Sequence, residues 1–190
     1  MLKQQRIDRL NRKILEEYSE QKIVLGHGNI NSSIILIGEA PGSNEVKLQK
    51  PFVGQAGKNF DEFLEILEID REEVYITNVV KYRPTKKSLK TQGVINRTPT
   101  KKEIELFKGY LLEEIDIIKP KIIVPLGNTP LKALFQKEHK ISEVHGTLFN
   151  ISINEIDYNV YPLYHPAAVI YRRELRKVYV DDLKKLKKII

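Results

Sequence analysis

Residues 34–42 read IILIGEAPG, four large apolar residues followed directly by a turn rich in glycine and proline. A short, uninterrupted apolar run that ends in glycine predicts a strand buried on both faces. Two more runs of this kind follow, VYITNVV at 74–80 and KIIVPLG at 121–127, and residues 143–164 contain two further strand-like runs. The chain therefore supplies several strands for a buried sheet.

Helical patterns separate these runs. Apolar residues recur at helical spacing in residues 5–20, from about Gly57 onward, and after a capping box formed by Thr100 and Glu103. Strands that alternate with helices are joined by parallel crossovers. We therefore predict an α/β fold, a three-layer α/β/α sandwich with a mainly parallel central sheet of about four strands. All 190 residues fit one domain, and the N-terminal helix, within residues 1–23, is expected to pack on it.

The composition bounds the possible partners. Thirty-two Lys and Arg against 25 Asp and Glu give a net charge of +7, which favours a polyanionic partner such as nucleic acid, although a lysine-rich composition alone has the same effect. No apolar run approaches the roughly 18 residues that span a bilayer, so we expect a cytoplasmic protein with no membrane partner. The sequence contains no cysteine, which excludes disulfides, cysteine nucleophiles and cysteine-bound zinc or iron-sulfur clusters.

Residues that carry chemistry follow the predicted strand ends. The turn Gly38–Gly42, Asn78, Gly127 and His165 come just after four predicted strands. Because the carboxyl ends of parallel strands form the ligand crevice, we expect these residues to meet in one pocket. The turn can present backbone N–H groups to an anion, but no GK[ST] follows, so it is not a Walker loop. Alone, a GxxPG turn is more often structural.

Six segments in order carry a more specific signal: VLGHGNINSSIILIGEAPG, PFVGQAGKNFDEFL, EEVYITNVVKYRP, NRTPTKKEIE, IKPKIIVPLG and YHPAAVI. Together they resemble family 4 of the uracil-DNA glycosylase superfamily, over roughly Val24 to Leu183 and near the family's spacing. The resemblance implies a monofunctional enzyme of base excision repair. Such an enzyme flips uracil out of DNA and hydrolyses its N-glycosidic bond, leaving an abasic site.

The resemblance assigns base recognition to two side chains. Phe52 is the ring on which a flipped base stacks, although a core aromatic is the simpler interpretation of that residue alone. Asn78 reads the base edge, because a carboxamide can accept from uracil N3–H and donate to O4, whereas cytosine presents the reversed pattern. The remaining substrate-binding candidates are the turn residues Gly38, Ala40, Pro41 and Gly42.

Cleavage leaves negative charge on the departing base, and His165 of the HPAA motif is expected to stabilise it by donating to uracil O2. The superfamily's most familiar branch orients the attacking water with an Asp in the turn. This chain has Ala40 there, as family 4 does. Another polar group must therefore orient the water, and we prefer Glu45 or Asn96 to Glu39.

DNA contacts are expected mainly after the histidine. The segment 166–173 combines an apolar tip with two arginines, which suits a wedge that fills the vacated stack, although it could also be an exposed turn. Uracil-containing DNA is the expected partner, and we expect a monomer. The candidate DNA-binding residues are Lys81, Arg83, Arg97, Ala167, Ala168, Val169, Arg172 and Arg173.

The chain departs from family 4 in two places. Typical members hold a four-iron cluster on four cysteines, whereas Tyr82 and Phe107 stand at two of the ligand positions here, so we expect no cofactor. The Lys-rich segment 85–95 is longer than usual and is expected to be a mobile, solvated loop. It lacks the histidine with which a related branch, family X, bonds to the sugar, so no covalent product is expected.

Two alternative functions remain open from the sequence. A glycosylase of the same fold could act on another deaminated base, such as hypoxanthine or xanthine. A catalytically silent DNA-binding module could also keep this fold after losing its cluster.

Overall fold

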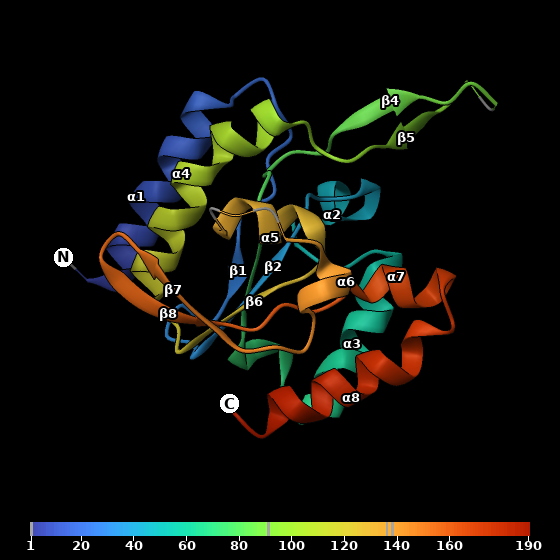
Figure 1. Cartoon of the computed structure of the whole chain (residues 1–190). Coiled ribbons are helices and arrows are strands. Elements are labelled where there is room, and N and C mark those ends of the chain that lie inside the picture. The colour runs from blue at the N-terminus through green and yellow to red at the C-terminus, as the bar shows by residue number, and fades with distance from the viewer. Residues whose placement is uncertain (1, 91, 136, 138) are drawn as a thin grey trace.

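The computed structural model describes residues 2–90, 92–135, 137 and 139–190, without the side chains of residues 55, 56, 58, 170 and 171. Its centre is a sheet with helices on both faces (Figure 1). The strands of this sheet are β1 (His27–Gly28), β2 (Ile34–Gly38), β3 (Tyr75–Asn78), β6 (Ile122–Pro125), β7 (Phe149–Ile153) and β8 (Ile156–Val160).

The strand order β1-β3-β2-β6-β8-β7 confirms the predicted α/β fold. The four inner strands β3, β2, β6 and β8 are parallel neighbours, while β1 and β7 pair antiparallel at the two edges. The sheet of about four strands that the apolar runs predict did not include these two edge strands. Strand β1 has only two residues, both exposed, and β7 alternates in burial until its last residue, so neither forms a continuous apolar run.

Two pairs of helices complete the layers. Helices α1 (Lys3–Glu17) and α4 (Lys101–Ile118) pack together over one face, and α3 (Gln55–Leu67) and α8 (Leu175–Lys187) cover the other. Strand β2 contributes to both interfaces: Ile35 and Ile37 belong to the core with α1 and α4, and Ile34 and Leu36 to the core with α3 and α8. A strand covered on both faces needs apolar residues at every position, which explains the continuous apolar run Ile34–Ile37.

Short elements gather where the parallel strands end. Strand β2 leads into α2 (Ser43–Leu48), β6 into α5 (Asn128–Leu134), and the segment after β8 into α7 (Pro166–Tyr171). The remaining short elements are α6 (Ile141–Val144) and the 3-10 turn η1 (Arg71–Glu73). No helix in the described parts of the chain is both long and apolar enough to cross a membrane.

Residues 85–96 differ from the expected irregular loop. They include a paired hairpin of β4 (Thr85–Lys87) and β5 (Val94–Asn96), in which Thr85 lies opposite Asn96 and Lys87 opposite Val94. The hairpin projects from the domain above α2 (Figure 1). The Lys-rich composition predicted its exposure correctly but not its strand pairing, because the alternating side chains of a short, exposed hairpin bury no apolar face.

Candidate active site

A cavity of about 380 Å³ opens where β2 and β3 end. Residues far apart in the sequence meet in it: Phe52 precedes α3, Asn78 ends β3, and His165 precedes α7. The prediction that residues after the strand ends share one pocket is thus met for Asn78, His165 and the turn residues Ala40 and Gly42. Gly127, expected in the same pocket, lines a neighbouring cavity instead. The cavity is lined by Ala40, Gly42, Ser43, Asn44, Glu45, Phe52, Gly54, Asn78, Asn96, His165 and Ala167.

Gly38 allows two of these side chains to approach each other. It is the last residue of β2 and pairs with Asn78 of β3. A Cβ atom on Gly38 would lie 2.4 Å from Asn78 Oδ1 and 2.7 Å from the ring of Phe52. Both distances are far inside van der Waals contact, so the site requires glycine here even though Gly38 does not itself line the cavity. Pro41, another predicted residue, is buried in the same turn.

Phe52 is held in an unusual backbone conformation. Its φ is 53°, in the left-handed region that a non-glycine residue rarely adopts. Arg71 fixes this turn, because its guanidinium donates to the carbonyl oxygens of Pro51 at 2.8 Å and Phe52 at 2.9 Å. The Phe52 ring packs against Phe60 with centroids 4.9 Å apart. Sequence reasoning missed Arg71, since it lies outside the recognised motifs and acts only through backbone oxygens.

His165 has a defined protonation state. Its Nδ1 accepts a hydrogen bond from the backbone N–H of Ala167 at 3.1 Å, which caps α7. Burial lowers the pKa of His165 to about 4, so the ring is neutral near pH 7. A neutral imidazole that accepts at Nδ1 carries its proton on Nε2. His165 can therefore donate one hydrogen bond from Nε2 without being a cation.

Glu45 ties α2 to the Phe52 turn. Its buried carboxylate accepts from the backbone N–H of Gly54 at 2.8 Å. A Cβ atom on Gly54 would lie 2.7 Å from Glu45 Oε1, so this close approach also requires glycine. Glu45 therefore positions the loop that carries Phe52.

Asn96 reaches the cavity from the end of the hairpin. Its Oδ1 accepts from Nε of Arg83 at 2.6 Å. Its Nδ2 faces the turn, since a Cβ atom on Gly42 would lie 3.6 Å from it. Arg83 thus fixes the orientation of this amide, whose N–H groups form no hydrogen bond with any other described residue.

Glu39 lines a neighbouring cavity of about 700 Å³, apart from the other two candidates for orienting the water, Glu45 and Asn96. Its Oε2 accepts from the hydroxyl of Thr129 at 2.5 Å, and burial raises the pKa of its carboxyl group. Ala40 and His165 line both cavities, so they form the boundary between them. Glu39 therefore faces this boundary from the opposite side to Glu45.

Lys81, a predicted DNA contact, lies inside the protein. The side chain is fully buried, and its Nζ lies 2.6 Å from Glu114 Oε2 and 2.5 Å from Thr77 Oγ1. The prediction that Lys81 contacts a phosphate is therefore wrong. A buried ammonium must be paired, and the carboxylate that pairs it, on α4, gave no signal in the motif around Lys81.

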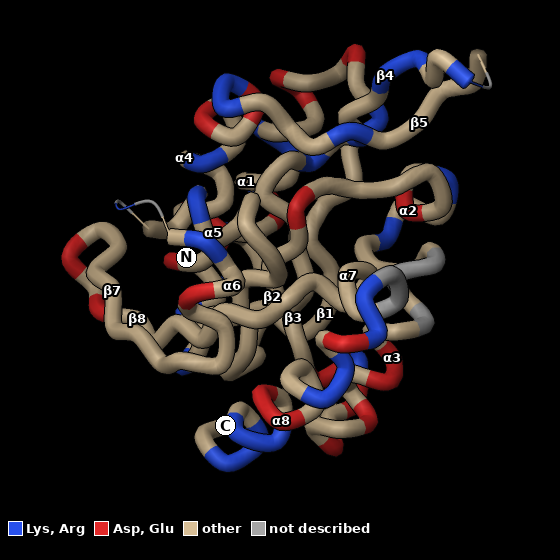
Figure 2. Tube along the Cα trace, turned by 45° about the vertical axis from the view of Figure 1, so that its right-hand side comes forward, with Lys and Arg blue, Asp and Glu red and all other residues tan. Residues whose placement is uncertain are grey.

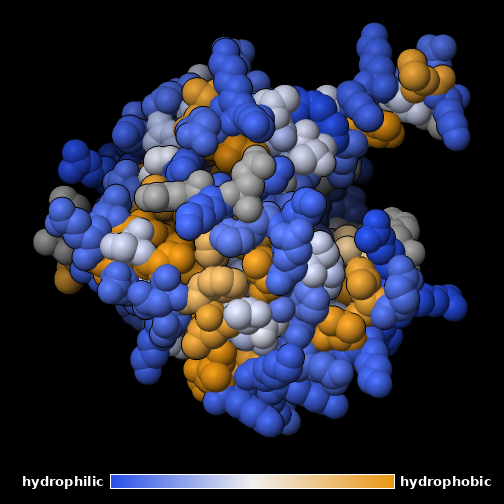
Figure 3. All heavy atoms as spheres, viewed as in Figure 1, coloured by the Kyte–Doolittle hydropathy of each residue, from blue (hydrophilic) through white to orange (hydrophobic). Residues whose placement is uncertain are grey.

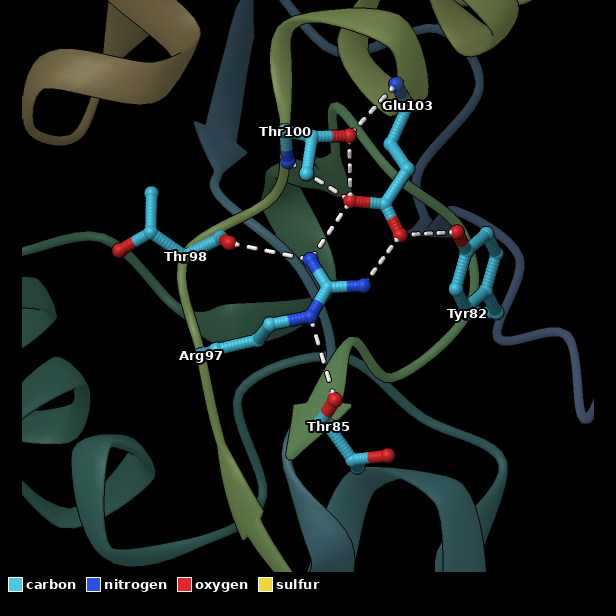
Figure 4. Close-up of polar contacts among 6 residues, drawn as sticks. All are labelled: Tyr82, Thr85, Arg97, Thr98, Thr100 and Glu103. Carbon is cyan, nitrogen blue, oxygen red and sulfur yellow. Dashed lines mark hydrogen bonds and ion pairs between the residues drawn. The ribbon is translucent and has the colours of Figure 1, made fainter. Parts of the chain in front are cut away.

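Arg97 is also engaged within the protein. It donates to both carboxylate oxygens of Glu103 at 2.7 Å, and also to the carbonyl oxygens of Thr85 and Thr98 (Figure 4). Hydrogen bonds from Arg97 hold the pKa of Glu103 well below its usual range. Glu103 in turn caps α4 through Thr100. Arg97 thus joins the base of the hairpin to α4.

The segment after His165 is a short helix rather than an exposed turn. Ala167 lines the first cavity, and Ala168 and Arg172 line the second. Val169 is partly buried against the core formed with α3 and α8, and Arg173 is exposed. Three of the predicted residues, Ala167, Ala168 and Arg172, therefore lie beside the cavities.

Aromatic rings occupy two of the four positions expected for cluster ligands, Tyr82 and Phe107. Phe107 packs against Tyr82 with centroids 5.7 Å apart, against Tyr18 at 4.5 Å and against Tyr110 at 6.2 Å. The hydroxyl of Tyr82 donates to Glu103. Without thiolates, and with packed rings in their place, these residues do not fit an iron-sulfur cluster. No group of three or more potential metal ligands occurs among the described residues.

A mainly parallel sheet that brings a ring, a carboxamide and a neutral imidazole into one cavity at its strand ends can bind a planar polar ligand such as a nucleobase. Residues 25–187 match the family model of the uracil DNA glycosylase superfamily, and the chain belongs to this superfamily.

Curated relatives support the resemblance to family 4. The chain is 42% identical over 171 residues to the type-4 uracil-DNA glycosylase of Sulfurisphaera tokodaii, covering 87% of this chain and 74% of the relative. It is 40% identical over 172 residues to the type-4 enzyme of Saccharolobus solfataricus (88% and 76% covered). It is 39% identical over 167 residues to that of Archaeoglobus fulgidus (86% and 79% covered).

Proposed function

We propose that this protein is a uracil-DNA glycosylase of DNA repair, which hydrolyses the bond between uracil and deoxyribose in DNA. The observation that carries this function is the single cavity shared by Phe52, Asn78 and His165. Base flipping, DNA binding and the residue roles given below are parts of the same proposal. We also propose that residues 1–190 form one domain and that the protein is a cytoplasmic monomer.

Asn78 distinguishes uracil from cytosine. Its buried carboxamide can pair with both N3–H and O4 of uracil while Phe52 supports one face of the base. Cytosine would leave buried polar groups unpaired, at a cost of about 1 to 3 kcal/mol for each group. Selectivity therefore follows from one amide held at a fixed place beside Gly38.

His165 stabilises the leaving base. When the C1′–N1 bond breaks, its electron pair goes to uracil, and the charge spreads to O2. A neutral imidazole can stabilise this anion by donating a hydrogen bond from Nε2, and it keeps its own proton while doing so. The hydrogen bond from Ala167 supports this role, because it holds the ring in the required tautomer.

Glu39 is our candidate for orienting the water. Water adds to C1′ on the side of the sugar opposite the base, and its proton passes to a carboxylate. Glu39 faces the boundary with the base cavity from the other side, and its raised pKa makes it a stronger base than an exposed carboxylate. This reverses the preference drawn from the sequence for Glu45 or Asn96. Glu45 then acts as a positioning residue, and Asn96 remains a candidate donor to the substrate.

DNA binding rests on exposed basic residues near the cavities. Arg172 and Arg173 follow the wedge helix, where Ala167, Ala168 and Val169 lie close to the vacated stack. Arg83, beside Asn96, remains a candidate phosphate contact. We propose that no iron-sulfur cluster or other cofactor takes part, because the chain has no cysteine and aromatic packing fills two of the four ligand positions.

The direct test is uracil release from an oligonucleotide. A duplex with one uracil should yield free uracil, and alkali should then cleave the strand at the abasic site. Matched duplexes with hypoxanthine or xanthine should yield far less product, which separates the main proposal from a glycosylase for another deaminated base. Absence of scission at stoichiometric protein, with DNA binding retained, would instead favour a silent DNA-binding module.

A further inference from the structure

The β4–β5 hairpin stands on one side of the base cavity and α7 on the other. Asn96 at the end of β5 and Ala167 in α7 both line this cavity. Figures 1 and 2 show α2 between the two elements, with the hairpin extending away from the domain. A DNA strand that places a nucleotide in the cavity must therefore pass between α7 and the base of the hairpin.

Strand geometry identifies which face of the hairpin looks toward the cavity. Side chains alternate along a strand, and directly opposed residues share a face. Asn96 lines the cavity, so Val94 lies on the same face, and so does Lys87, the partner of Val94. Lys86 and its partner Ile95 lie on the opposite face. The two lysines are adjacent in sequence but point to opposite sides.

The hairpin has the composition of a surface that binds a polyanion. The segment 85–97 contains three lysines and one arginine but no Asp or Glu, and Figure 2 shows its basic positions along the projecting arm. Lys87 is exposed and forms no ion pair with any described residue. Val94 is 61% exposed and Leu89 is fully exposed, and Figure 3 shows hydrophobic beside hydrophilic residues on the arm. An isolated two-stranded hairpin gains little stability from such residues.

The base of the hairpin is fixed although its tip is exposed. Arg97 joins the chain after β5 to α4, and Arg83 holds Asn96 beside the cavity. A contact made by the arm would thus act on a segment that carries a residue of the site. Since a strand rises by about 3.3 Å per residue, the three paired residues of each strand span about 10 Å, a length over which one DNA strand presents roughly three phosphates.

We propose that the β4–β5 hairpin is a second DNA-binding arm, which holds the DNA flanking the uracil from the side opposite α7. Lys87 binds a backbone phosphate, and Val94 packs against the adjacent sugar. The Lys86 face points away from the DNA. This inference rests on the proposed function for its ligand, and the positive charge without any acidic residue favours DNA over a protein partner.

The matched variants Lys87→Gln and Lys86→Gln test this arrangement, because both remove one charge from neighbouring exposed positions. Affinity for a 20-base-pair duplex without uracil is measured from 50 to 200 mM salt. One lost phosphate contact reduces the magnitude of the slope of log affinity against log salt by about 0.9. Between 50 and 200 mM salt, the variant should therefore lose about 3.5-fold less affinity than the wild type. Lys87→Gln should show this change, and Lys86→Gln should match the wild type, with unchanged melting temperatures for both.

Equal slopes for Lys87→Gln and the wild type would overturn the proposal, and so would an equal loss in both variants. A separate assay tests the proposed glycosylase function itself. The wild-type protein is tested for uracil release from a trinucleotide with central deoxyuridine, which is too short to reach the hairpin. No release there or from any duplex would contradict glycosylase activity, while the salt slopes would still decide whether the arm binds DNA.

Discussion

The rings of Phe52 and His165 lie with their centroids 5.5 Å apart and their planes inclined by only 26°. In the proposed mechanism, the group that supports the base and the group that stabilises its charge thus belong to one wall of the cavity. Phe52 is held there by a left-handed turn and His165 by the cap of α7. A base stacked against Phe52 would thus meet the donor of His165 without rearrangement of either ring.

Replacing His165 with alanine should slow uracil release by about 10²- to 10³-fold, the usual effect of losing one donor to a developing anion. Affinity for DNA without uracil should be unchanged. Single-turnover rates and binding measurements check both expectations. A variant that kept the full rate would remove His165 from the mechanism.

The pH dependence gives a second test of His165. Because its pKa is lowered to about 4 by burial, its charge does not change between pH 5.5 and 8. The ratio of wild-type to His165→Gln single-turnover rates should therefore stay constant over this range. An inflection of the ratio near pH 6.5 would show that the imidazole titrates normally.

Replacing Asn78 with aspartate should reduce the preference for uracil over cytosine by at least about tenfold. The carboxylate cannot donate to uracil O4, and each unpaired buried group costs about 1 to 3 kcal/mol. Release of both bases from matched oligonucleotides measures the ratio. An unchanged ratio would mean that another residue reads the base edge.

Glu39→Gln and Glu45→Gln should separate the two carboxylates. Loss of the group that accepts a proton should lower the single-turnover rate by about 10²- to 10⁴-fold in Glu39→Gln. Glutamine at position 45 still offers an oxygen to the N–H of Gly54, so that variant should keep most of its rate. The opposite result would assign the water to Glu45, one of the two residues preferred from the sequence.

Arg97→Met should destabilise the protein in a pH-dependent way. The pKa of Glu103 is lowered in the folded state, so the stabilisation is fully present above the unfolded pKa of about 4.3 and is lost as pH falls toward the folded value. At pH 7 we expect a loss of roughly 1.5 kcal/mol, or a melting temperature lower by about 3 to 6 °C.

The difference in melting temperature between Arg97→Met and the wild type should shrink below about pH 4. Arg176→Met is the matched control, because its ion pair with Glu62 is exposed. It should lower the melting temperature by no more than about 2 °C. If the two variants behaved alike at every pH, the Arg97 network would add nothing beyond a surface ion pair.

The fold could be predicted because the inner strands are covered on both faces. Residues such as Ile34–Ile37 must then all be apolar, which leaves a continuous run in the sequence. Asn78 and His165 could be proposed because each lies in a recognisable motif near a strand end, and Phe52 because it lies in the motif that precedes α3. The close contacts that require Gly38 and Gly54 became visible only with the side chains in place.

The environment of charged residues could not be predicted in the same way. Lys81 is neutralised by a residue of another element, 33 positions away, and the tie between Arg97 and Glu103 joins the hairpin to α4. Arg71 acts on backbone oxygens 19 and 20 positions earlier in the chain. Nothing in the local sequence distinguishes these basic residues from exposed ones such as Arg173.

The most direct test of the central claim is a crystal structure of the protein soaked with uracil, prepared without iron. Uracil should lie in the cavity with one face on Phe52, with the Asn78 amide about 2.7 to 3.2 Å from N3 and O4, and with His165 Nε2 at a similar distance from O2. Uracil bound elsewhere, or bound in the cavity without contact to Asn78 and His165, would contradict the account.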